Sequence, residues 1–242
     1  MKPRHPLLAR RVTSMEVLET NGGSAFVLPG AAAVMGFQFR GRVRHDGALL
    51  TRAGVTGVLS SARTFDYLGP TASVLVRFTP QGAASLGLPV SELSKRSVGL
   101  EDFLPRARVA ELLERLEGAA QNGERLALVE QFLAGFADGG DAAVTRALAR
   151  LDATPDAAIH AVAREVGLSE RQLERRFLSR VGVTPQRYVS LRRFERAVEL
   201  SKITPTLAEA AHAAGYADQS HFNREFRRYT QRAPSEVLRT AR

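Results

Sequence analysis

The feature that most constrains the fold is an internal repeat near the end of the chain. The segment VGLSERQLERRFLSRVGVTPQRY, residues 166–188, aligns with AGYADQSHFNREFRRYTQRAPSEV, residues 214–237, which carries one extra residue in the turn after its glycine. Each copy has a glycine turn, two apolar residues four positions apart, and a proline eight positions after the second of them. Two copies are too few for a solenoid. The spacing therefore predicts a duplicated helix-turn-helix.

Matched positions support this prediction. A helix of small residues precedes each copy, as AIHAVAREV and LAEAAHAA. The second helix of each copy is expected to begin after Ser169 or Asp218, because both residue types are good N-caps. Apolar residues at i and i+4 lie on one helix face and are expected to point inward. These pairs are Leu173 with Phe177, and Phe222 with Phe226.

The opposite faces of the two second helices are polar and rich in arginine. Such side chains can recognise base edges in a major groove, because arginine pairs with guanine, asparagine or glutamine with adenine, and glutamate accepts from cytosine. The residues expected to read bases are Arg171, Glu174, Arg175, Gln219, Ser220, His221, Asn223 and Arg224. For His221, a solvent-facing place near the helix start is an equal alternative. A merely solvated face would explain one such helix but does not require two copies with matched spacing.

The charge of the chain favours the same interpretation. The formal net charge is +9, and residues 141–242 contribute +6 of it, from 18 basic and 12 acidic residues. A dense positive charge favours a polyanionic partner through counterion release, although arginine used for solubility would give the same excess. The arginines expected to contact DNA phosphates are Arg180, Arg187, Arg192, Arg227 and Arg228.

The first part of the chain predicts a β-rich domain. Between residues 24 and 79 the runs SAFVLPG, AAVMGFQFR, GVTGVLSS and ASVLVRFTP are separated by glycine, proline and aspartate. Short apolar runs at intervals of about ten residues are typical of a small β-barrel or β-sandwich, here expected to be cupin-like. The fold class is therefore α+β. We expect a β-rich sensor or dimerisation domain with trailing helices at residues 1–138 and an all-α domain at residues 139–242.

The trailing helices of the first domain connect it to the second. After Pro80 the apolar spacing becomes helical, and FADGGDAA, residues 136–143, is the expected linker. One helical stripe consists of Val109, Leu112, Leu113 and Leu116. A stripe of this kind either pairs two copies of the chain or packs on the β domain, so both a monomer and a homodimer stay open.

Several classes of function lack the residues that they need. The absence of cysteine excludes disulfides, thiolate metal sites and cysteine nucleophiles. The β-rich part offers only His5 and His45, so no metal site is expected. No phosphate-binding loop or nucleophile elbow occurs, which predicts no catalytic residues, no cofactor and no enzyme activity. The chain shows neither a signal peptide nor a long apolar run, which predicts a cytoplasmic protein without a membrane span.

The helical part resembles a known family. The residues GLSERQLERRF and GVTPQRYVSLRRFERAVEL, followed by LAEAAHAAGYADQSHFNREFRRYTQRAPSE, are similar to the DNA-binding domain of the AraC/XylS family of bacterial transcription regulators. The resemblance covers about residues 141–242. It implies two helix-turn-helix subdomains joined by a helix from about Pro185 to Lys202, with both recognition helices in successive major-groove segments. Gln231 replaces the glycine that is usual in the family, at a position expected to be left-handed.

The β-rich part resembles, more weakly, the sensor domains of some of these regulators, through FVLPGAAAVMGFQF and VRFTPQGAASLGLPVSEL. Related sequences carry an acidic residue after Leu-Pro, which Pro29-Gly30-Ala31 lacks. The resemblance implies a sequence-specific regulator that binds double-stranded DNA and responds to a small-molecule effector or a partner at its N-terminal domain. RNA polymerase is left open as a partner, and the effector-binding residues are unassigned. The alternative is a small-molecule-binding or protein-interaction module whose helical domain does not bind specific DNA.

Overall fold

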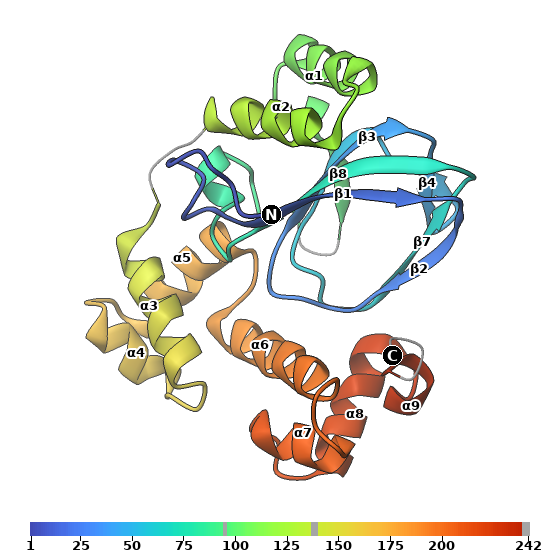
Figure 1. The fold of residues 1–242 in the computed structure, drawn as a ribbon. Coiled ribbons are helices and arrows are strands. Elements are labelled where there is room, and N and C mark those ends of the chain that lie inside the picture. Colours follow the sequence, from blue (N-terminus) through green and yellow to red (C-terminus); the bar gives the residue numbers. More distant parts are fainter. Residues whose placement is uncertain (94–95, 137–139, 239–242) are drawn as a thin grey trace.

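The computed structural model describes residues 1–93, 96–136 and 140–238, and shows a β-sandwich followed by helices (Figure 1). The strands are β1 Val12–Thr20, β2 Gly23–Val27, β3 Val34–Arg40, β4 Val43–His45, β5 Ala48–Leu49, β6 Ala53–Thr56, β7 Arg63–Tyr67, β8 Thr71–Phe78 and β9 Ser97–Gly99. The helices are α1 Arg106–Gly118, α2 Asn122–Ala134, α3 Ala142–Ala153, α4 Ile159–Glu165, α5 Glu170–Val181, α6 Pro185–Leu200, α7 Leu207–Ala213, α8 Gln219–Thr230 and α9 Pro234–Val237. The predicted α+β class is confirmed. The proposed boundary between residues 138 and 139 lies outside the described residues.

Two antiparallel sheets form the sandwich. One has the strand order β1-β8-β3-β6-β9, and the other has the order β2-β7-β4-β5. Successive side chains of a strand point to opposite faces of its sheet. In β3, Met35 and Phe37 are therefore buried on one face, whereas Val34, Gly36 and Gln38 face the space between the sheets.

Helices α1 and α2 cover the outer face of the five-stranded sheet (Figure 1). Phe37 of β3 meets Phe132 of α2 edge to face, with 5.9 Å between ring centroids. The whole apolar stripe of α1 is buried in this core, with Leu113, its most exposed member, at 8%. Of the two roles expected for this stripe, the structure shows packing on the β domain.

The strands agree only partly with the prediction. β2, β3, β6 and β8 overlap the four predicted runs, whereas β1, β4, β5, β7 and β9 fall outside them. β1 pairs with β8 along nearly its whole length, from Val12 opposite Phe78 to Thr20 opposite Thr71. Only Val12 and Met15 of β1 are buried, so its sequence lacks the regular alternation that marks a half-buried strand.

The helical part contains the two predicted helix-turn-helix units, α4–α5 and α7–α8, joined by α6 (Figure 1). Helix α6 begins at Pro185 as expected, and the Thr184 side chain caps it by accepting a hydrogen bond from the backbone N of Arg187 at 3.3 Å. It ends at Leu200, two residues before the predicted end. Within the described ranges, no helix is long and apolar enough to cross a membrane.

Helix α6 supplies the common core of both units. Phe194 packs against Phe226 at 5.4 Å and against Tyr229 at 4.9 Å, which fixes α8. Six positions earlier, Tyr188 meets Phe177 of α5 at 5.8 Å. These rings are all buried, so both second helices are held by aromatic contacts to one rigid element.

Candidate nucleic-acid interface and sandwich cavity

Helix α5 is fixed at both ends and along one face. The Ser169 side chain accepts from the backbone N of Gln172, whose own side chain accepts from the backbone N of Ser169, so the two form a capping box. Gly182 ends the helix with φ of 87°, a left-handed conformation that favours glycine. Leu173 and Phe177 are fully buried, as the repeat predicts.

The opposite face of α5 is open. Arg171, Glu174 and Arg175 are exposed, as expected for residues that read bases. Leu178 continues this face and is 41% exposed. Arg176 lies beside this stripe and turns back to Asp141, with 3.4 Å between its Nη1 and Oδ2. The face thus offers polar groups that form no ion pair among the described residues.

Helix α8 repeats this arrangement with a different set of side chains. The Asp218 side chain caps it by accepting from the backbone N of His221 at 2.7 Å. Phe222 and Phe226 are fully buried. On the outer face, Gln219, Ser220 and Arg224 are exposed. The sequence therefore predicted both the cap and the buried pair of each helix correctly.

Two of the predicted base-reading residues lie at the edge of this face. His221 is half-buried, and its ring meets Tyr216 edge to face at 5.3 Å. Asn223 is also half-buried, and its side-chain Oδ1 is buried with no hydrogen-bond partner among the described residues. The structure therefore separates these two residues from the three that are openly exposed.

The predicted phosphate contacts fall into two groups. Arg180 is half-buried at the end of α5, and Arg227 and Arg228 are exposed on α8. Arg187 instead donates to the carbonyl of Ser60 at 2.8 Å, and its guanidinium lies 4.7 Å from the Tyr229 ring centroid. Arg187 therefore joins α6 to the sandwich.

Arg192 belongs to a network on the other side of α6. Its Nε lies 3.2 Å from Asp152 Oδ1, and its Nη1 lies 2.8 Å from Glu195 Oε2. Asp152 also accepts a hydrogen bond from the hydroxyl of Tyr188 at 2.9 Å. Burial, together with the nearby Asp152 carboxylate, raises the pKa of Tyr188 well above its usual range. The network ties α6 to α3, and it pairs the guanidinium of Arg192 with two carboxylates although the side chain is 48% exposed.

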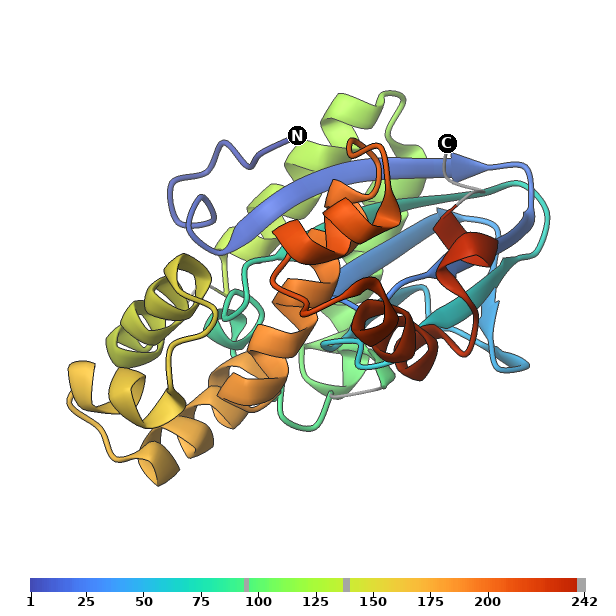
Figure 2. The same cartoon turned by 90° about the horizontal axis from the view of Figure 1, so that it is seen from below.

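Glu195 extends this network to the sandwich, and no pattern in the sequence predicts this role. Its Oε1 accepts from the backbone N of Ala31 at 2.9 Å. A second contact joins the same two parts, because the backbone N of Ala62 donates to the carbonyl of Tyr229 at 2.8 Å. Figure 2 shows α6 and α8 against the strands from below. The sandwich therefore contacts the linker helix and the second helix-turn-helix unit directly.

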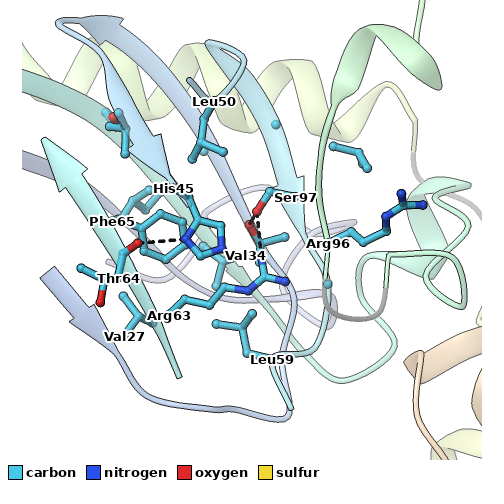
Figure 3. A pocket seen from close by; sticks show the side chains of 18 of the residues that line it. Val27, Val34, His45, Leu50, Leu59, Arg63, Thr64, Phe65, Arg96 and Ser97 are labelled. Carbon is cyan, nitrogen blue, oxygen red and sulfur yellow. Dashed lines mark hydrogen bonds between the residues drawn. The ribbon is translucent and has the colours of Figure 1, made fainter. Parts of the chain in front are cut away.

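Between the two sheets lies a cavity of about 880 Å³ (Figure 3). Its polar groups include His45, Arg63 and Ser97, and its apolar walls include Val34 and Phe65. Leu28 and Gly30 also line it, immediately before the loop that Glu195 holds. Within the described part of the chain, no three histidine, aspartate or glutamate side chains gather as a metal site would require.

Left-handed Gln231 completes the geometry of the second unit. Its φ is 58°, so the conformation expected where the family usually has glycine is confirmed. The preceding Thr230 is buried, and its hydroxyl donates to the carbonyl of Phe226 at 2.8 Å. The turn after α8 is thereby held without glycine.

Comparison with known proteins agrees with this geometry. Residues 162–240 match the family described as "Helix-turn-helix domain". The match spans helices α5 to α9 and so includes both second helices, α5 and α8. Over 81 residues the chain is 33% identical to the HTH-type transcriptional activator RhaS of Pectobacterium atrosepticum, and over 78 residues it is 35% identical to RhaS of Escherichia coli. The aligned segments cover 33% and 32% of this chain but only 29% and 28% of those relatives.

The whole fold is similar to a solved structure. ToxT from Vibrio cholerae covers 93% of this chain and 97% of its own, with a TM-score of 0.51 and 15% sequence identity. A second ToxT structure, with an unsaturated fatty acid bound, gives a TM-score of 0.53 at 16% identity, over 94% of this chain and 96% of its own. At this identity the likeness shows the fold alone, a β-rich part followed by a helical part.

Proposed function

We propose that this protein is a transcription regulator that binds specific double-stranded DNA in the bacterial cytoplasm. The observation that carries the proposal is the pair of capped helices, α5 and α8, held on one helix with their polar faces open. Arg171, Glu174 and Arg175 would read one major-groove segment. Gln219, Ser220 and Arg224 would read the next, with His221 and Asn223 at the edge of the contact.

The contacts that the arginines make within the chain divide the expected phosphate contacts into two groups. Arg227, Arg228 and Arg180 lie near the open faces and would hold the DNA backbone. Arg187 and Arg192 are engaged within the chain, so their part in DNA binding would require those contacts to open. The name of RhaS, a transcriptional activator, supports regulation of transcription.

We further propose that the sandwich cavity holds a small-molecule effector. The cavity lies next to the loop that contacts Glu195, so a ligand there could shift α6 and with it both reading helices. The fatty acid bound to ToxT supports a small-molecule ligand in a protein of this fold.

Selection of bound duplexes from a random-sequence pool tests the DNA-binding proposal. We expect enrichment of an asymmetric site with two dissimilar elements about one helical turn, ~10 bp, apart. The matched control is a variant with Arg175→Ala and Arg224→Ala, which alters two exposed side chains and leaves the buried core intact. If the duplexes bound by the parent protein showed no enriched sequence, the proposal would be contradicted. That result would favour the alternative, a binding module without specific DNA recognition.

A further inference from the structure

Two glycines lie side by side at the centre of the five-stranded sheet, on the face that lines the cavity. Gly36 of β3 and Gly54 of β6 are direct cross-strand partners. Both line the cavity, whereas their neighbours Met35 and Val55 fill the opposite face. Buried space in proteins is normally filled to close packing. A pair of glycines at this place therefore leaves room for something other than the chain.

Three arginines line this cavity, Arg63, Arg77 and Arg96, and Arg63 has no acidic partner among the described residues. Arg63 is half-buried, and its Nη1 donates to Ser97 Oγ at 3.2 Å. Ser97 Oγ lies 2.8 Å from Thr56 Oγ1, so the two hydroxyls and the guanidinium form one polar group. Among the described residues, Arg63 forms no ion pair within 4.0 Å. Burial lowers the pKa of Arg63, and Asp46 opposes this only in part. A partly desolvated cation of this kind favours an anion.

The cavity wall is mixed, and apolar side chains surround Arg63. Figure 3 shows Val27, Val34, Leu59 and Phe65 around the Arg63 side chain. The ring of His45 lies against Phe65, with centroids 5.1 Å apart, and adds a flat surface. Ligand pockets commonly combine an apolar wall with a few polar groups that fix orientation, in volumes of about 300–1,000 Å³.

We infer that the cavity binds a small organic carboxylate with an apolar body, whose carboxylate is held by Arg63 and Ser97. The apolar body would lie over the paired glycines and against Phe65. This inference rests on the proposed function, since it names the chemical class of the effector. A neutral polyol fits less well, because it offers no charge to the guanidinium of Arg63 and no apolar body to the side chains around it.

Calorimetric titration of the full chain with carboxylates tests the inference. The series is benzoate, 1-naphthoate, octanoate and oleate, each compared with its neutral amide. We expect at least one carboxylate to bind at least tenfold more tightly than its amide. In Arg63→Gln this preference should fall below threefold. Equal binding of acid and amide, or no binding by any of the four carboxylates, would overturn the inference.

Two further variants separate the site from a general effect of charge or folding. Arg44→Gln removes a neighbouring cation that pairs with Asp66 outside the cavity, and should leave the preference unchanged. Gly36→Val places a side chain in the space over the paired glycines. A Cβ at Gly36 would meet only Leu75, at an ordinary 3.5 Å, so the variant should fold. It should weaken binding of acid and amide alike by at least tenfold, and unchanged binding would place the ligand elsewhere and overturn the inference.

Failure of this inference is distinguishable from failure of the proposed function. Carboxylate binding is measured without DNA, and selection of DNA is measured without carboxylate. If the chain selects DNA but shows no preference for carboxylates, the proposed function is supported and the inference is refuted. If the chain binds the carboxylate through Arg63 but selects no DNA, the proposed regulator function is refuted and the inferred anion site is supported.

Discussion

The carboxylate of Glu195 accepts a hydrogen bond from the backbone N–H of Ala31, with 2.9 Å between Oε1 and N. Its other oxygen pairs with Arg192, so one side chain links the edge of the sandwich cavity to the network around Asp152. A Cβ on Gly30 would lie 2.8 Å from Glu195 Oε1, so the glycine gives this carboxylate its room. The acidic residue missing from the Pro29-Gly30-Ala31 loop is thus matched by one on α6.

This contact should slow hydrogen exchange at Ala31. Hydrogen bonds to charged groups contribute about 1.5–3 kcal/mol, which corresponds to more than tenfold in local opening. Glu195→Ala is therefore expected to speed exchange of the Ala31 amide at least tenfold. Glu199→Ala is the matched control, because Glu199 lies one turn away and its side chain pairs only with Lys202 among the described ion pairs. Equal exchange in both variants would show that the contact does not hold the loop.

The salt dependence of DNA affinity should distinguish among the arginines that the sequence predicts as phosphate contacts. Each phosphate contact adds about 0.9 to the slope of log affinity against log salt concentration. Arg228→Gln should lower the slope by about this amount, because the Arg228 side chain is 63% exposed and its ion pair, at 3.4 Å, is with Glu225 of the same helix. Arg192→Gln should leave the slope unchanged, since Arg192 is engaged by Asp152 and Glu195. The measurement is DNA affinity at several salt concentrations. A larger change in slope for Arg192→Gln than for Arg228→Gln would contradict the assignment.

The buried hydroxyl of Tyr188 should make the helical part sensitive to alkali. Because its pKa is raised in the folded protein, the unfolded chain loses this proton first as the pH rises above about 10. The stability that Tyr188 contributes is therefore complete below pH ~10 and is lost above it, with a slope of up to about 1.4 kcal/mol per pH unit. Urea unfolding between pH 8 and 11 should show a shallower loss in Tyr188→Phe. Identical slopes would mean that the hydroxyl titrates normally.

The sequence predicted those parts of the fold in which local chemistry determines structure. Ser169 and Asp218 cap their helices, and Phe222 and Phe226 are buried, because N-cap chemistry and i,i+4 spacing act within a few residues. The contact between Glu195 and Ala31 joins positions 164 residues apart. No local pattern marks such a pair. For the same reason, the sequence did not predict the contacts of Arg187 and Arg192 within the chain.

The apolar stripe of α1 shows a second limit of the sequence. Periodicity places Leu113 on an apolar face but does not say whether that face meets the same chain or another copy. In the structure Leu113 is 8% exposed and belongs to the core under the sheet. Leu113→Glu should therefore unfold the N-terminal part, since a buried unpaired charge costs about 4 kcal/mol or more. Thermal unfolding with a mass measurement checks this, and a folded variant that only loses dimers would contradict it.

The position of Arg63 in the cavity also could not be predicted from the sequence. Its strand, RTFDY, is short and polar, and only the pairing of β7 with β2 and β4 brings its side chain to the cavity. The paired glycines Gly36 and Gly54 are likewise 18 positions apart in the sequence, and only the register of β3 with β6 brings them together. Long-range pairing, which sequence patterns do not reveal, therefore forms the cavity and its cation.

The most direct test of the proposed recognition is a base-substitution scan of the selected DNA site with the parent protein, Arg175→Ala and Arg224→Ala. Arg175→Ala should relax base preference in one element of the site only, and Arg224→Ala in the other. Each loss should be about 1–3 kcal/mol at the affected guanine, the range for a bidentate arginine contact. Uniform weakening at every position by both variants would contradict base reading by α5 and α8 and would leave the helical part only an electrostatic contact to DNA.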